Sequence, residues 1–321
     1  MITNSSEFEI KGALETIKKA KRIAIIPHRA PDGDAIGAAV AVKLALKQLG
    51  KKPRTICIDP PPKYTDFLPE TDLFEKELKL DEHDLLIFVD CGAHYMSKFH
   101  ERIPNLFDGH MDIINIDHHG SNDFFGMINI VEPQAASTTQ ILYELFRKWG
   151  IELSKEISTC LMTGLYFDTG SFRHTNTTPD VLKIAGDLLA KGADYKTISK
   201  EIFQTKSSNK LKLWGKALSN IKKTDKAIVT SAITNDDYSQ CETDSKDLEG
   251  VIDYLNAIPE SKFCMLLSED QKGGVKASMR TQREDVDLSK IAEVFGGGGH
   301  KMASGFRIEG NLKEEKYWSI N

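Results

Sequence analysis

The first half of the chain alternates short, almost continuously apolar runs with longer stretches of helical character. Continuous apolar runs are typical of strands that are buried on both faces, because such strands have no solvent-facing side. The runs that we interpret as strands are Arg22–Pro27, Arg54–Ile58, Leu85–Asp90 and Asp112–Asp117. The stretches that we interpret as helices are Asp34–Leu49, Ser137–Trp149 and Ser154–Asp168. This alternation predicts an N-terminal α/β domain with a mainly parallel sheet flanked by helices.

The second half of the chain has a different pattern. From Thr178 to about Lys222 the sequence is helical and rich in lysine, which indicates a connector. Strand-like runs follow at Ala227–Ile233, Lys262–Ser268 and Gly274–Arg280, and helix-like stretches lie at Leu248–Leu255 and Leu288–Val294. We therefore expect a smaller C-terminal α/β domain at 225–321, which a helical linker at 191–224 joins to a first domain at 1–190.

The composition of the 321 residues argues against several classes of protein. The longest apolar stretch, Ala35–Val42, ends at Lys43 and is far shorter than the roughly 20 residues that a membrane-spanning helix requires. The N-terminus lacks the basic-then-apolar order of a signal peptide, and the five cysteines form no C-x-x-C pair. We therefore expect a cytoplasmic protein with no membrane partner and no disulfide framework. The formal net charge of −5 predicts no platform for long nucleic acid, so a nucleic-acid substrate should be short or gripped locally.

The first motif with candidate chemistry directly follows the first predicted strand. It runs from His28 to Gly37 and reads H-R-A-P-D-G-D-A-I-G. One imidazole and the carboxylates of Asp32 and Asp34 can converge on a point in such a loop, which favours a metal site. The alternative is an Asp-rich turn in which Asp34 caps the next helix.

Three further motifs place acids or histidines at the ends of predicted elements. They are Asp90 in I-F-V-D, Asp117, His118 and His119 in I-N-I-D-H-H, and Asp168 at the end of a helical run. An isolated carboxylate at the end of a buried strand is costly unless it is paired or bound to a metal. Each motif also has a simpler interpretation, as an acid that accepts loop amide bonds or as histidines on a surface loop.

If each of the two strand-end motifs gives one ligand, an acid from the first and an imidazole from the second, then together with the His28–Asp34 loop and the helix-end acid the motifs supply two histidines and four carboxylates. Ligands in open α/β sheets gather where the parallel strands end. Imidazole and carboxylate donors without thiolates suit Mn²⁺, Mg²⁺ or Fe²⁺ better than structural Zn²⁺. Six ligands are too many for one catalytic ion that must leave room for water, so the pattern predicts two divalent metal ions that share carboxylates.

A glycine-rich motif near the C-terminus, Phe295–Phe306, reads F-G-G-G-G-H-K-M-A-S-G-F. Consecutive glycines leave backbone N–H groups uncovered and let an anion or a base approach closely. A flexible glycine hinge is the alternative. His300 directly after the glycines, together with Ser278 and Arg280 upstream of the motif, favours a phosphate site.

In this order the motifs resemble those of the DHH phosphoesterases that carry a DHH-associated C-terminal domain. The resemblance covers nearly the whole chain and rests on His28–Gly37, Val89-Asp90, Asp117–His119, Asp168 and Gly296–His300. Within this family the chain is most similar to the NrnA-type members, which degrade very short oligoribonucleotides and remove the 3′-phosphate of adenosine 3′,5′-bisphosphate (pAp). Ala38 and Ser304 stand where the family often has Ser and Ala, and neither change removes a ligand.

The resemblance implies a role for each metal-binding position. One Mn²⁺ would be held by His28, Asp32 and Asp90. The other would be held by Asp34, Asp90, His118 and Asp168, with Asp90 and Asp168 as the bridging positions. Mn²⁺ is the expected cofactor, with Mg²⁺ and Fe²⁺ as the alternative ions.

The remaining site residues follow from the same resemblance. His119 would face the scissile phosphate rather than a metal, and Asp117 would orient the histidine pair. The far phosphate and base of the substrate would be bound in the C-terminal domain by Ser278, Arg280, Gly297, Gly298, Gly299 and His300. The reaction would then take place in the cleft between the domains.

We therefore expect an enzyme that hydrolyses short oligoribonucleotides to 5′-mononucleotides and pAp to AMP, by in-line attack of a metal-activated hydroxide on phosphorus. The closest alternative is a phosphodiesterase of the same family that cleaves cyclic di-AMP or linear pApA. An inorganic pyrophosphatase and a RecJ-type exonuclease of long strands are less expected. From other classes, we consider a non-catalytic nucleotide sensor and, without a supporting feature, a structural partner-binding protein. Homologues often pair, so a homodimer is compatible with the resemblance.

Overall fold

The computed structural model describes residues 5–204, 206–270 and 273–313. Contacts divide the chain into two compact units, Met1–Thr205 and Lys206–Asn321, and each unit is described by itself. In the described part of the chain, the structure contains no helix with the length and apolar character needed to cross a membrane.

The first unit is built on a parallel sheet of five strands in the order β2-β1-β3-β4-β5. The strands are β1 (Ile23–Pro27), β2 (Arg54–Thr55), β3 (Leu85–Val89), β4 (Asp112–Asp117) and β5 (Ile128–Val131). The predicted fold class is confirmed, and four of these strands correspond to the predicted runs. The strand β2 is shorter than expected because the chain continues only as an isolated bridge between Ile56 and Glu75. The strand β5 was not predicted from its short sequence.

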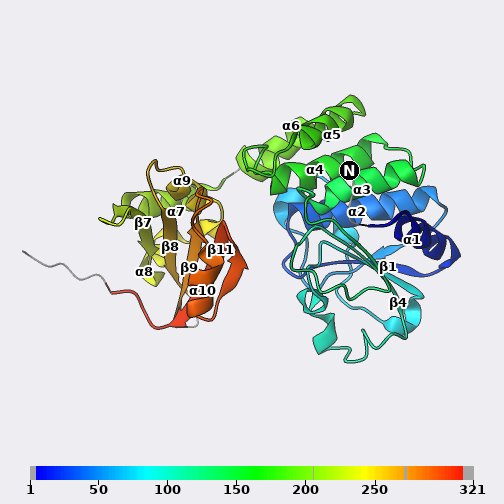
Figure 1. The fold of residues 1–321 in the computed structure, drawn as a ribbon, viewed down its shortest axis with the longest axis horizontal. Coiled ribbons are helices and arrows are strands. Elements are labelled where there is room, and N and C mark those ends of the chain that lie inside the picture. Colours follow the sequence, from blue (N-terminus) through cyan, green and yellow to red (C-terminus); the bar gives the residue numbers. More distant parts are fainter. Residues whose placement is uncertain (1–4, 205, 271–272, 314–321) are drawn as a thin grey trace, which may run out of the picture. The chain divides into compact units, whose positions relative to one another are not determined.

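One face of this sheet is covered by helices, as Figure 1 shows for α2, α3 and α4 beside β1 and β4. The helices of the unit are α1 (Glu7–Lys19), α2 (Gly33–Gln48), α3 (Thr138–Lys148), α4 (Lys155–Asp168), α5 (Pro179–Ala190) and α6 (Tyr195–Ser199), and a π-helix follows at Lys200–Gln204. Ile25 and Ile87 pack into the cluster on the helical face. Ile26 and Phe88 belong to a second cluster, which contains residues of the loops. The strands are therefore buried on both faces, which explains their continuous apolar sequence.

The second face is covered by loops and short 3₁₀ helices rather than by long helices. Leu80–Glu82 and Phe99–Glu101 pack on this face through Leu80 and Phe99, and His94–Ser97 lies beside Phe107 of the same cluster. The 3₁₀ helix Lys63–Thr65 packs on the helical face through Tyr64, and Thr71–Leu73 precedes Phe74, which packs there too. Phe99 and Leu106 are buried against this side of the sheet. His28, Asp90 and His118, described below, follow the carboxyl ends of β1, β3 and β4.

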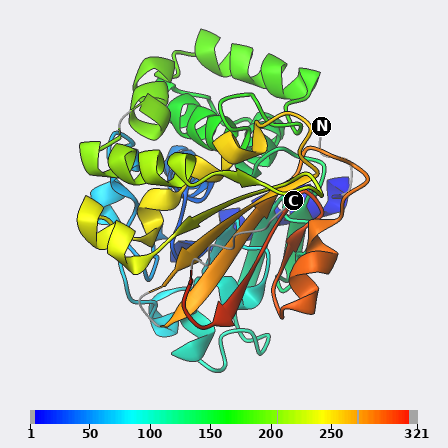
Figure 2. The same ribbon diagram turned by 90° about the vertical axis from the view of Figure 1, so that its left-hand side faces the viewer.

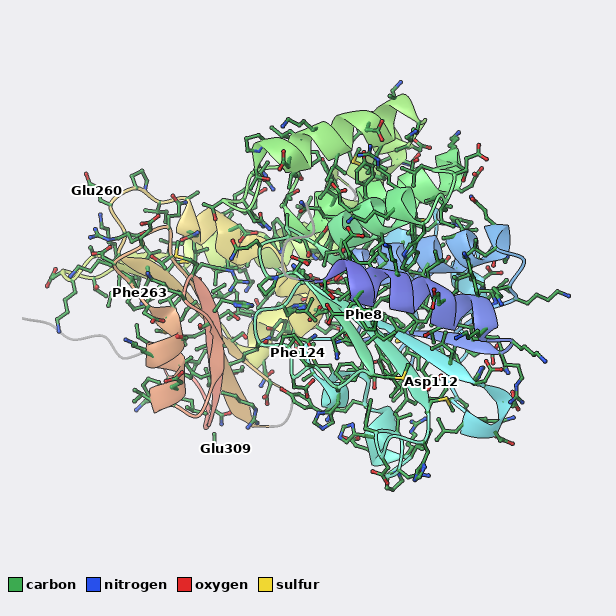
Figure 3. The ribbon with its side chains drawn as sticks, turned by 45° about the vertical axis from the view of Figure 1, so that its right-hand side comes forward. Phe8, Asp112, Phe124, Glu260, Phe263 and Glu309 are labelled. Carbon is green, nitrogen blue, oxygen red and sulfur yellow. The ribbon has the colours of Figure 1, made fainter. Side chains whose placement is uncertain are left out.

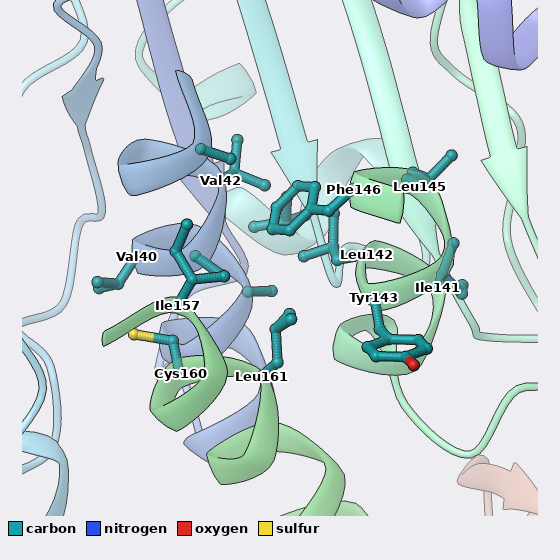
Figure 4. Packing of buried hydrophobic residues seen from close by; sticks show 14 of the residues in the cluster. Val40, Val42, Ile141, Leu142, Tyr143, Leu145, Phe146, Ile157, Cys160 and Leu161 are labelled. Carbon is teal, nitrogen blue, oxygen red and sulfur yellow. The ribbon is translucent and has the colours of Figure 1, made fainter. Parts of the chain in front are cut away.

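The helices α2 and α4 approach each other closely, as Figure 4 shows with Val40 of α2 near Ile157 and Cys160 of α4. Gly37 makes this contact possible, because a Cβ at that position would lie 2.6 Å from the carbonyl oxygen of Cys160. Gly164 of α4 lies at the same contact, since a Cβ on Gly37 would be 3.3 Å from its backbone nitrogen. The contact places the beginning of α2 and the end of α4 at the same edge of the sheet.

The second unit has a six-stranded sheet in the order β10-β11-β9-β8-β7-β6. The strands are β6 (Lys222–Lys223), β7 (Ile228–Ile233), β8 (Phe263–Glu269), β9 (Gly274–Arg280), β10 (Gly298–His300) and β11 (Ala303–Glu309). The helices are α7 (Ser208–Ser219), α8 (Asn235–Cys241), α9 (Val251–Asn256) and α10 (Leu288–Val294), with a 3₁₀ helix at Ser245–Leu248. Only β7 and β8 pair in parallel, and the other pairs are antiparallel. Figure 2 shows these strands side by side.

The segment predicted as a connector is divided between the two units. The helices α5 and α6 pack in the first unit, where Val181 and Ile198 are part of its core. The helix α7 packs in the second unit through Leu213 and Ala217. The predicted domain ranges remain predictions, and their outer ends, 1–4 and 314–321, lie outside the described residues.

Candidate metal centre and substrate-binding face

The predicted metal ligands of the first unit all lie where the parallel strands end. His28 follows β1, Asp90 follows β3, and His118 follows β4. Figure 3 labels Asp112 at the amino end of β4 and Phe124 in the loop beyond its carboxyl end, so the two mark opposite ends of the sheet. The candidate site lies at the carboxyl end, which is the usual ligand edge of such a sheet.

Two helix ends bring the remaining acids to this edge. Asp32 caps α2 by accepting hydrogen bonds from the backbone N–H groups of Asp34 and Ala35, at 2.9 and 3.1 Å. Asp34 lies in the first turn of α2, and Asp168 is the last residue of α4. Because α2 and α4 pack closely, these acids meet although they lie far apart in the sequence.

The side chains form three groups in which the candidate ligand atoms lie within 4.8 Å of one another. The groups are His28, Asp32 and Asp90; Asp34, His118 and Asp168; and Asp90, His118 and His119. The first two groups contain all six residues predicted as metal ligands. His119 joins the third group, although we expect it to contact the substrate. The roles of these residues remain predictions.

The distances within the cluster fit shared metal ions better than hydrogen bonds. Nε2 of His118 lies 3.3 Å from Asp168 and 3.6 Å from Asp90, and Nε2 of His28 lies 3.6 Å from Asp90. The separations of 3.6 Å exceed the range of a hydrogen bond. Two donor atoms that each lie about 2.1 Å from one ion are separated by about 3.0 to 3.6 Å when the angle at the ion is about 90 to 120°.

Backbone carbonyl groups direct the two candidate histidine ligands. Nδ1 of His28 lies 2.7 Å from the carbonyl oxygen of Arg29, and Nδ1 of His118 lies 3.3 Å from that of Ala135. A ring that donates its Nδ1 proton to a carbonyl group leaves Nε2 as the atom available to a metal. This arrangement is the usual support of a metal-binding histidine.

The amino end of α3 holds two of the acids, and the sequence reasoning missed this contact. Asp34 accepts hydrogen bonds from the backbone N–H groups of Thr138 and Thr139, at 2.6 and 3.1 Å, and from the Thr139 hydroxyl at 2.8 Å. The Thr138 hydroxyl donates to Asp90 at 3.0 Å. The Ser-Thr-Thr sequence signals a helix start, with Ser137 as the cap, but not the acids that the helix supports.

The electrostatics of the cluster favour a divalent cation. Burial raises the pKa of Asp34, Asp168 and Asp32, and neighbouring carboxylates raise it further. Burial alone would also raise the pKa of Asp90, but the imidazoles of His28 and His118 lower it. Asp32, Asp34 and Asp168 therefore resist ionisation beside the ionised Asp90, and a bound cation would neutralise the cluster and stabilise the ionised acids. The donor set of oxygen and imidazole atoms therefore fits a divalent metal site.

His119 is supported differently from His118. Its Nδ1 lies 2.8 Å from Oδ1 of Asp117, a carboxylate that is completely buried. Burial would lower the pKa of His119, but Asp117 and Asp90 raise it to about 9. Asp117 therefore holds His119, whereas His118 is directed by the carbonyl group of Ala135.

In the second unit, strand register places predicted substrate residues on one face of the sheet. Gly305 of β11 pairs with Ser278 of β9 and with Gly298 of β10, and Ala303 pairs with Arg280 and with His300. Directly paired residues point to the same face of a sheet. These positions are half-buried or exposed, and small residues separate Arg280 from His300. The opposite face of β9 and β11 is packed against α10 through Met279, Phe306 and Ala292.

The predicted glycines differ in what the structure requires of them. A Cβ on Gly297 would lie 2.2 Å from the carbonyl oxygen of Gly305, and one on Gly299 would lie 2.6 Å from that of Ala303. These two glycines are therefore needed for close packing of the chain against β11. Gly298 has no atom within 4 Å of such a Cβ, so its face is open to a ligand.

Comparison with known proteins supports this arrangement. Residues 22–165 match the family model described as the DHH family, N-terminal domain, and residues 225–317 match the DHHA1 domain. The chain is 34% identical to the bifunctional oligoribonuclease and PAP phosphatase NrnA of Thermus thermophilus, over 92% of this chain and 86% of that protein. The chain belongs to the DHH family. The predicted relationship and the expectation of a phosphoesterase of this family are thereby confirmed.

Two further similarities concern a solved structure and a longer relative. The crystal structure of an exopolyphosphatase-related protein from Bacteroides fragilis matches with a TM-score of 0.89 and 26% identity, over 97% of this chain and 94% of that chain. The cyclic-di-AMP phosphodiesterase GdpP of Bacillus subtilis is 26% identical over 92% of this chain, but the match covers only 46% of GdpP. The similarity therefore extends through both units.

Proposed function

We propose that this chain is a divalent-metal-dependent hydrolase that converts short oligoribonucleotides to 5′-mononucleotides and pAp to AMP. The observation that carries the proposal is the cluster of two histidines and four aspartates at the carboxyl edge of the first sheet. The relationship to a protein named oligoribonuclease and PAP phosphatase, over nearly the whole length of both chains, supports the substrate class.

The metal ligands are proposed as two sets that share Asp90. His28, Asp32 and Asp90 would hold one ion. The second ion would be held by Asp34, Asp90, His118 and Asp168, with Asp168 as a second bridging position. When bound, the ions supply activation of water and neutralisation of charge on the phosphoryl oxygens. Mn²⁺ is the ion that we propose, with Mg²⁺ or Fe²⁺ as the alternatives.

His119 is proposed to act on the phosphate itself, with Asp117 as its support. Asp117 holds Nδ1 of His119, so Nε2 is the atom left to donate a proton or a hydrogen bond to a phosphate oxygen. With no metal bound, Asp117 and Asp90 raise the pKa of His119 to about 9, which favours the protonated ring that a donor to an anion requires. Asp117 thus supports the catalytic His119 without contacting the substrate.

The face formed by β9, β10 and β11 is the proposed site for the other end of the substrate. Arg280 and His300 supply charge and hydrogen-bond donors for a phosphate. Gly298 leaves the backbone accessible, so that a phosphate or a base can approach it closely. We further propose a cytoplasmic location and no membrane partner, and a homodimer remains a prediction.

A panel of substrates tests this proposal. The purified protein is incubated with Mn²⁺, and in parallel with a chelator, on pAp, a three-residue RNA, pApA, cyclic di-AMP, a long RNA and pyrophosphate. Mn²⁺-dependent turnover of pAp and of the short RNA is the expected result. Asp90→Ala should lose nearly all turnover, because it removes the ligand shared by both sets. Full activity of Asp90→Ala would contradict the two-metal assignment.

A second candidate function is hydrolysis of cyclic di-AMP or pApA. The similarity to GdpP, which extends over 92% of this chain, favours it. Turnover of only these two substrates would retain the metal mechanism and replace the substrate proposal. No turnover of any substrate, with the metal bound, would instead support a nucleotide sensor.

A further inference from the structure

Asn122 is a buried polar residue beside the site that neither the motifs nor the proposed mechanism uses. It lies in the turn after β4, where its backbone N–H donates to the carbonyl oxygen of His119 at 3.1 Å. Its side chain is 7% exposed, and its amide nitrogen donates a hydrogen bond of 2.7 Å to Oδ2 of Asp117. Because Oδ1 of Asp117 accepts from His119, the three side chains form a continuous chain of hydrogen bonds.

The orientation of the Asn122 amide is unambiguous. Its carbonyl oxygen accepts from the backbone N–H of Phe124 at 2.8 Å, and a backbone N–H can only donate. The second amide hydrogen is directed at the carbonyl oxygen of Cys91, 3.1 Å away, which can only accept. If the amide were flipped, its NH₂ group would face the N–H of Phe124, which is also a donor. Its oxygen would face the Asp117 carboxylate and the Cys91 carbonyl oxygen, which are both acceptors. Asn122 therefore presents a donor to Asp117.

A second asparagine supports the first from inside the sheet. Asn115, which is completely buried on β4, donates to the carbonyl oxygen of Asn122 at 3.0 Å. Asn129 on β5 belongs to the same network, since its carbonyl oxygen accepts from Asn115 at 3.3 Å and its amide donates to the carbonyl oxygen of Gly126 at 2.7 Å. The hydrogen bonds of the Asn129 side chain go to Asn115 and Gly126 rather than to Asp117, so Asn129 provides a matched reference position.

We propose that Asn122 is a positioning residue for His119, and that it acts by fixing the carboxylate of Asp117. Asp117 has two oxygens and a single histidine partner. Without a donor on its second oxygen the carboxylate can rotate, and Nδ1 of His119 then loses a fixed acceptor. The ring of His119 would no longer present Nε2 in one direction. Such supporting contacts around a metal or catalytic histidine typically change activity by about 10–100-fold.

The kinetic test rests on the proposed function and compares Asn122→Ala with Asn129→Ala. Both changes remove a network amide and should lower thermal stability. We expect only Asn122→Ala to lower kcat by about 10–100-fold, with KM and the bound metal content unchanged. In an Asp117→Ala background the Asn122 substitution should have little further effect, because two residues that act through one contact are not additive. Equal losses of kcat at both positions, or independent effects of Asn122 and Asp117, would overturn the proposal.

A second readout separates this inference from the proposed function. In Mg²⁺-loaded protein with ¹⁵N-labelled histidine, the Nδ1–H signal of His119 should persist in Asn129→Ala and weaken through exchange in Asn122→Ala. Asn122→Ser, which keeps a polar group in the space but cannot reach Asp117, serves if the alanine variant does not fold. If the unmodified protein hydrolyses nothing, the proposed function fails and this signal still decides the role of Asn122. An unchanged signal in the Asn122 variants would overturn it.

Discussion

The side-chain hydroxyl of Thr138 donates a hydrogen bond of 3.0 Å to Oδ1 of Asp90, while the backbone N–H of Thr138 donates one of 2.6 Å to Oδ2 of Asp34. One residue at the amino end of α3 therefore holds two of the carboxylates proposed as metal ligands. Both acids are buried, and the partial positive charge of a helix amino end favours their ionised forms. The geometry of the metal centre is thus linked to the position of α3.

Replacing Thr138 by valine tests this link, because valine keeps the shape and the backbone N–H but removes the hydroxyl. We expect the affinity for Mn²⁺ to fall by about 10–100-fold, since Asp90 loses a contact that orients it. Titration of Mn²⁺ into metal-free protein measures the affinity directly. Activity should be reduced at limiting Mn²⁺ and should recover in excess.

Two variants complete this experiment. Thr138→Ser retains the hydroxyl and should bind Mn²⁺ with nearly the original affinity. Thr163→Val removes another buried hydroxyl, which donates to the helix carbonyl group of Thr159 at 2.8 Å, and should leave metal binding unchanged. If Thr138→Val and Thr163→Val bind Mn²⁺ equally well, the hydroxyl of Thr138 does not support the site.

A second prediction concerns Gly164, on the helix α4. A Cβ at this position would lie 2.1 Å from Oδ1 of Asp34 and 2.5 Å from Oγ1 of Thr139. Alanine at position 164 cannot be accommodated without moving Asp34 or the helix. We expect Gly164→Ala to lose metal binding and to destabilise the protein by about 1–3 kcal/mol, the usual range for overpacking. Metal titration and thermal unfolding measure the two effects separately.

Gly186, on the helix α5, is the matched control for this substitution. A Cβ at this position meets no atom within 4 Å, so alanine fits without a clash. Because alanine is the better helix former, Gly186→Ala should stabilise the protein by up to about 1 kcal/mol and leave metal binding intact. Normal metal binding by Gly164→Ala would show that the site tolerates a shift of Asp34.

Sequence reasoning succeeded where the signal was local. The strands β1, β3 and β4 are continuously apolar because both faces of the sheet are covered, and each is followed at the carboxyl edge by a polar residue that is a candidate ligand. The position of His28, Asp90 and His118 directly after predicted parallel strands was therefore enough to predict that they lie close together. The strand β5, with only four residues, has too short a pattern to be distinguished from a loop.

The residues that support the ligands could not be predicted in this way. The hydrogen bond between Thr138 and Asp34 joins residues that are 104 positions apart, and the one to Asp90 spans 48 positions. A threonine at a helix start or a glycine within a helix has many local explanations. In the glycine-rich motif the sequence indicated a ligand site but not a packing role. Gly297 and Gly299 are also needed for packing, because a Cβ at either position would clash with the backbone of β11.

A third prediction concerns the stability of the metal-free protein as a function of pH. The raised pKa of Asp34 and Asp168, and of His28 and His119 to about 9, mean that the native state holds more protons than the unfolded state between about pH 5 and 9. Stability therefore falls as the pH rises through this range, by about 1.4 kcal/mol per unit of pH for each extra proton held. Asp90 has a lowered pKa, so its contribution is lost only at lower pH.

Thermal unfolding with a chelator and with Mn²⁺, from pH 5 to pH 9, measures this dependence. We expect the Tm of the chelated protein to fall as the pH is raised. Mn²⁺ competes with the same protons, so its stabilising effect should be largest at high pH. The variant Asp168→Asn has one acid fewer and should show a weaker dependence in chelator. A Tm that rises with pH in chelator would contradict the proposed electrostatics of the cluster.

The last prediction concerns the substrate face of the second unit, where Arg280 and Arg307 offer a matched pair. The guanidinium of Arg307 pairs with Asp270 and Glu309, so its charge is already compensated. Arg280 donates only to the backbone carbonyl group of Met279, at 3.0 Å, and within the described residues it pairs with no carboxylate. Arg280 is therefore the arginine of this sheet whose charge is available to a phosphate.

We expect Arg280→Ala to raise KM for pAp by about tenfold or more, the magnitude of one lost hydrogen bond to a charged group, with a smaller change in kcat. KM should change more than kcat because Arg280 is proposed to hold the distant phosphate rather than the phosphate that reacts. Arg307→Ala, also on the second sheet, should leave both constants unchanged. Steady-state kinetics with pAp and with adenosine 3′-phosphate, which lacks the second phosphate, makes the test specific. If the loss in Arg280→Ala is equally large for both substrates, Arg280 does not bind the distant phosphate.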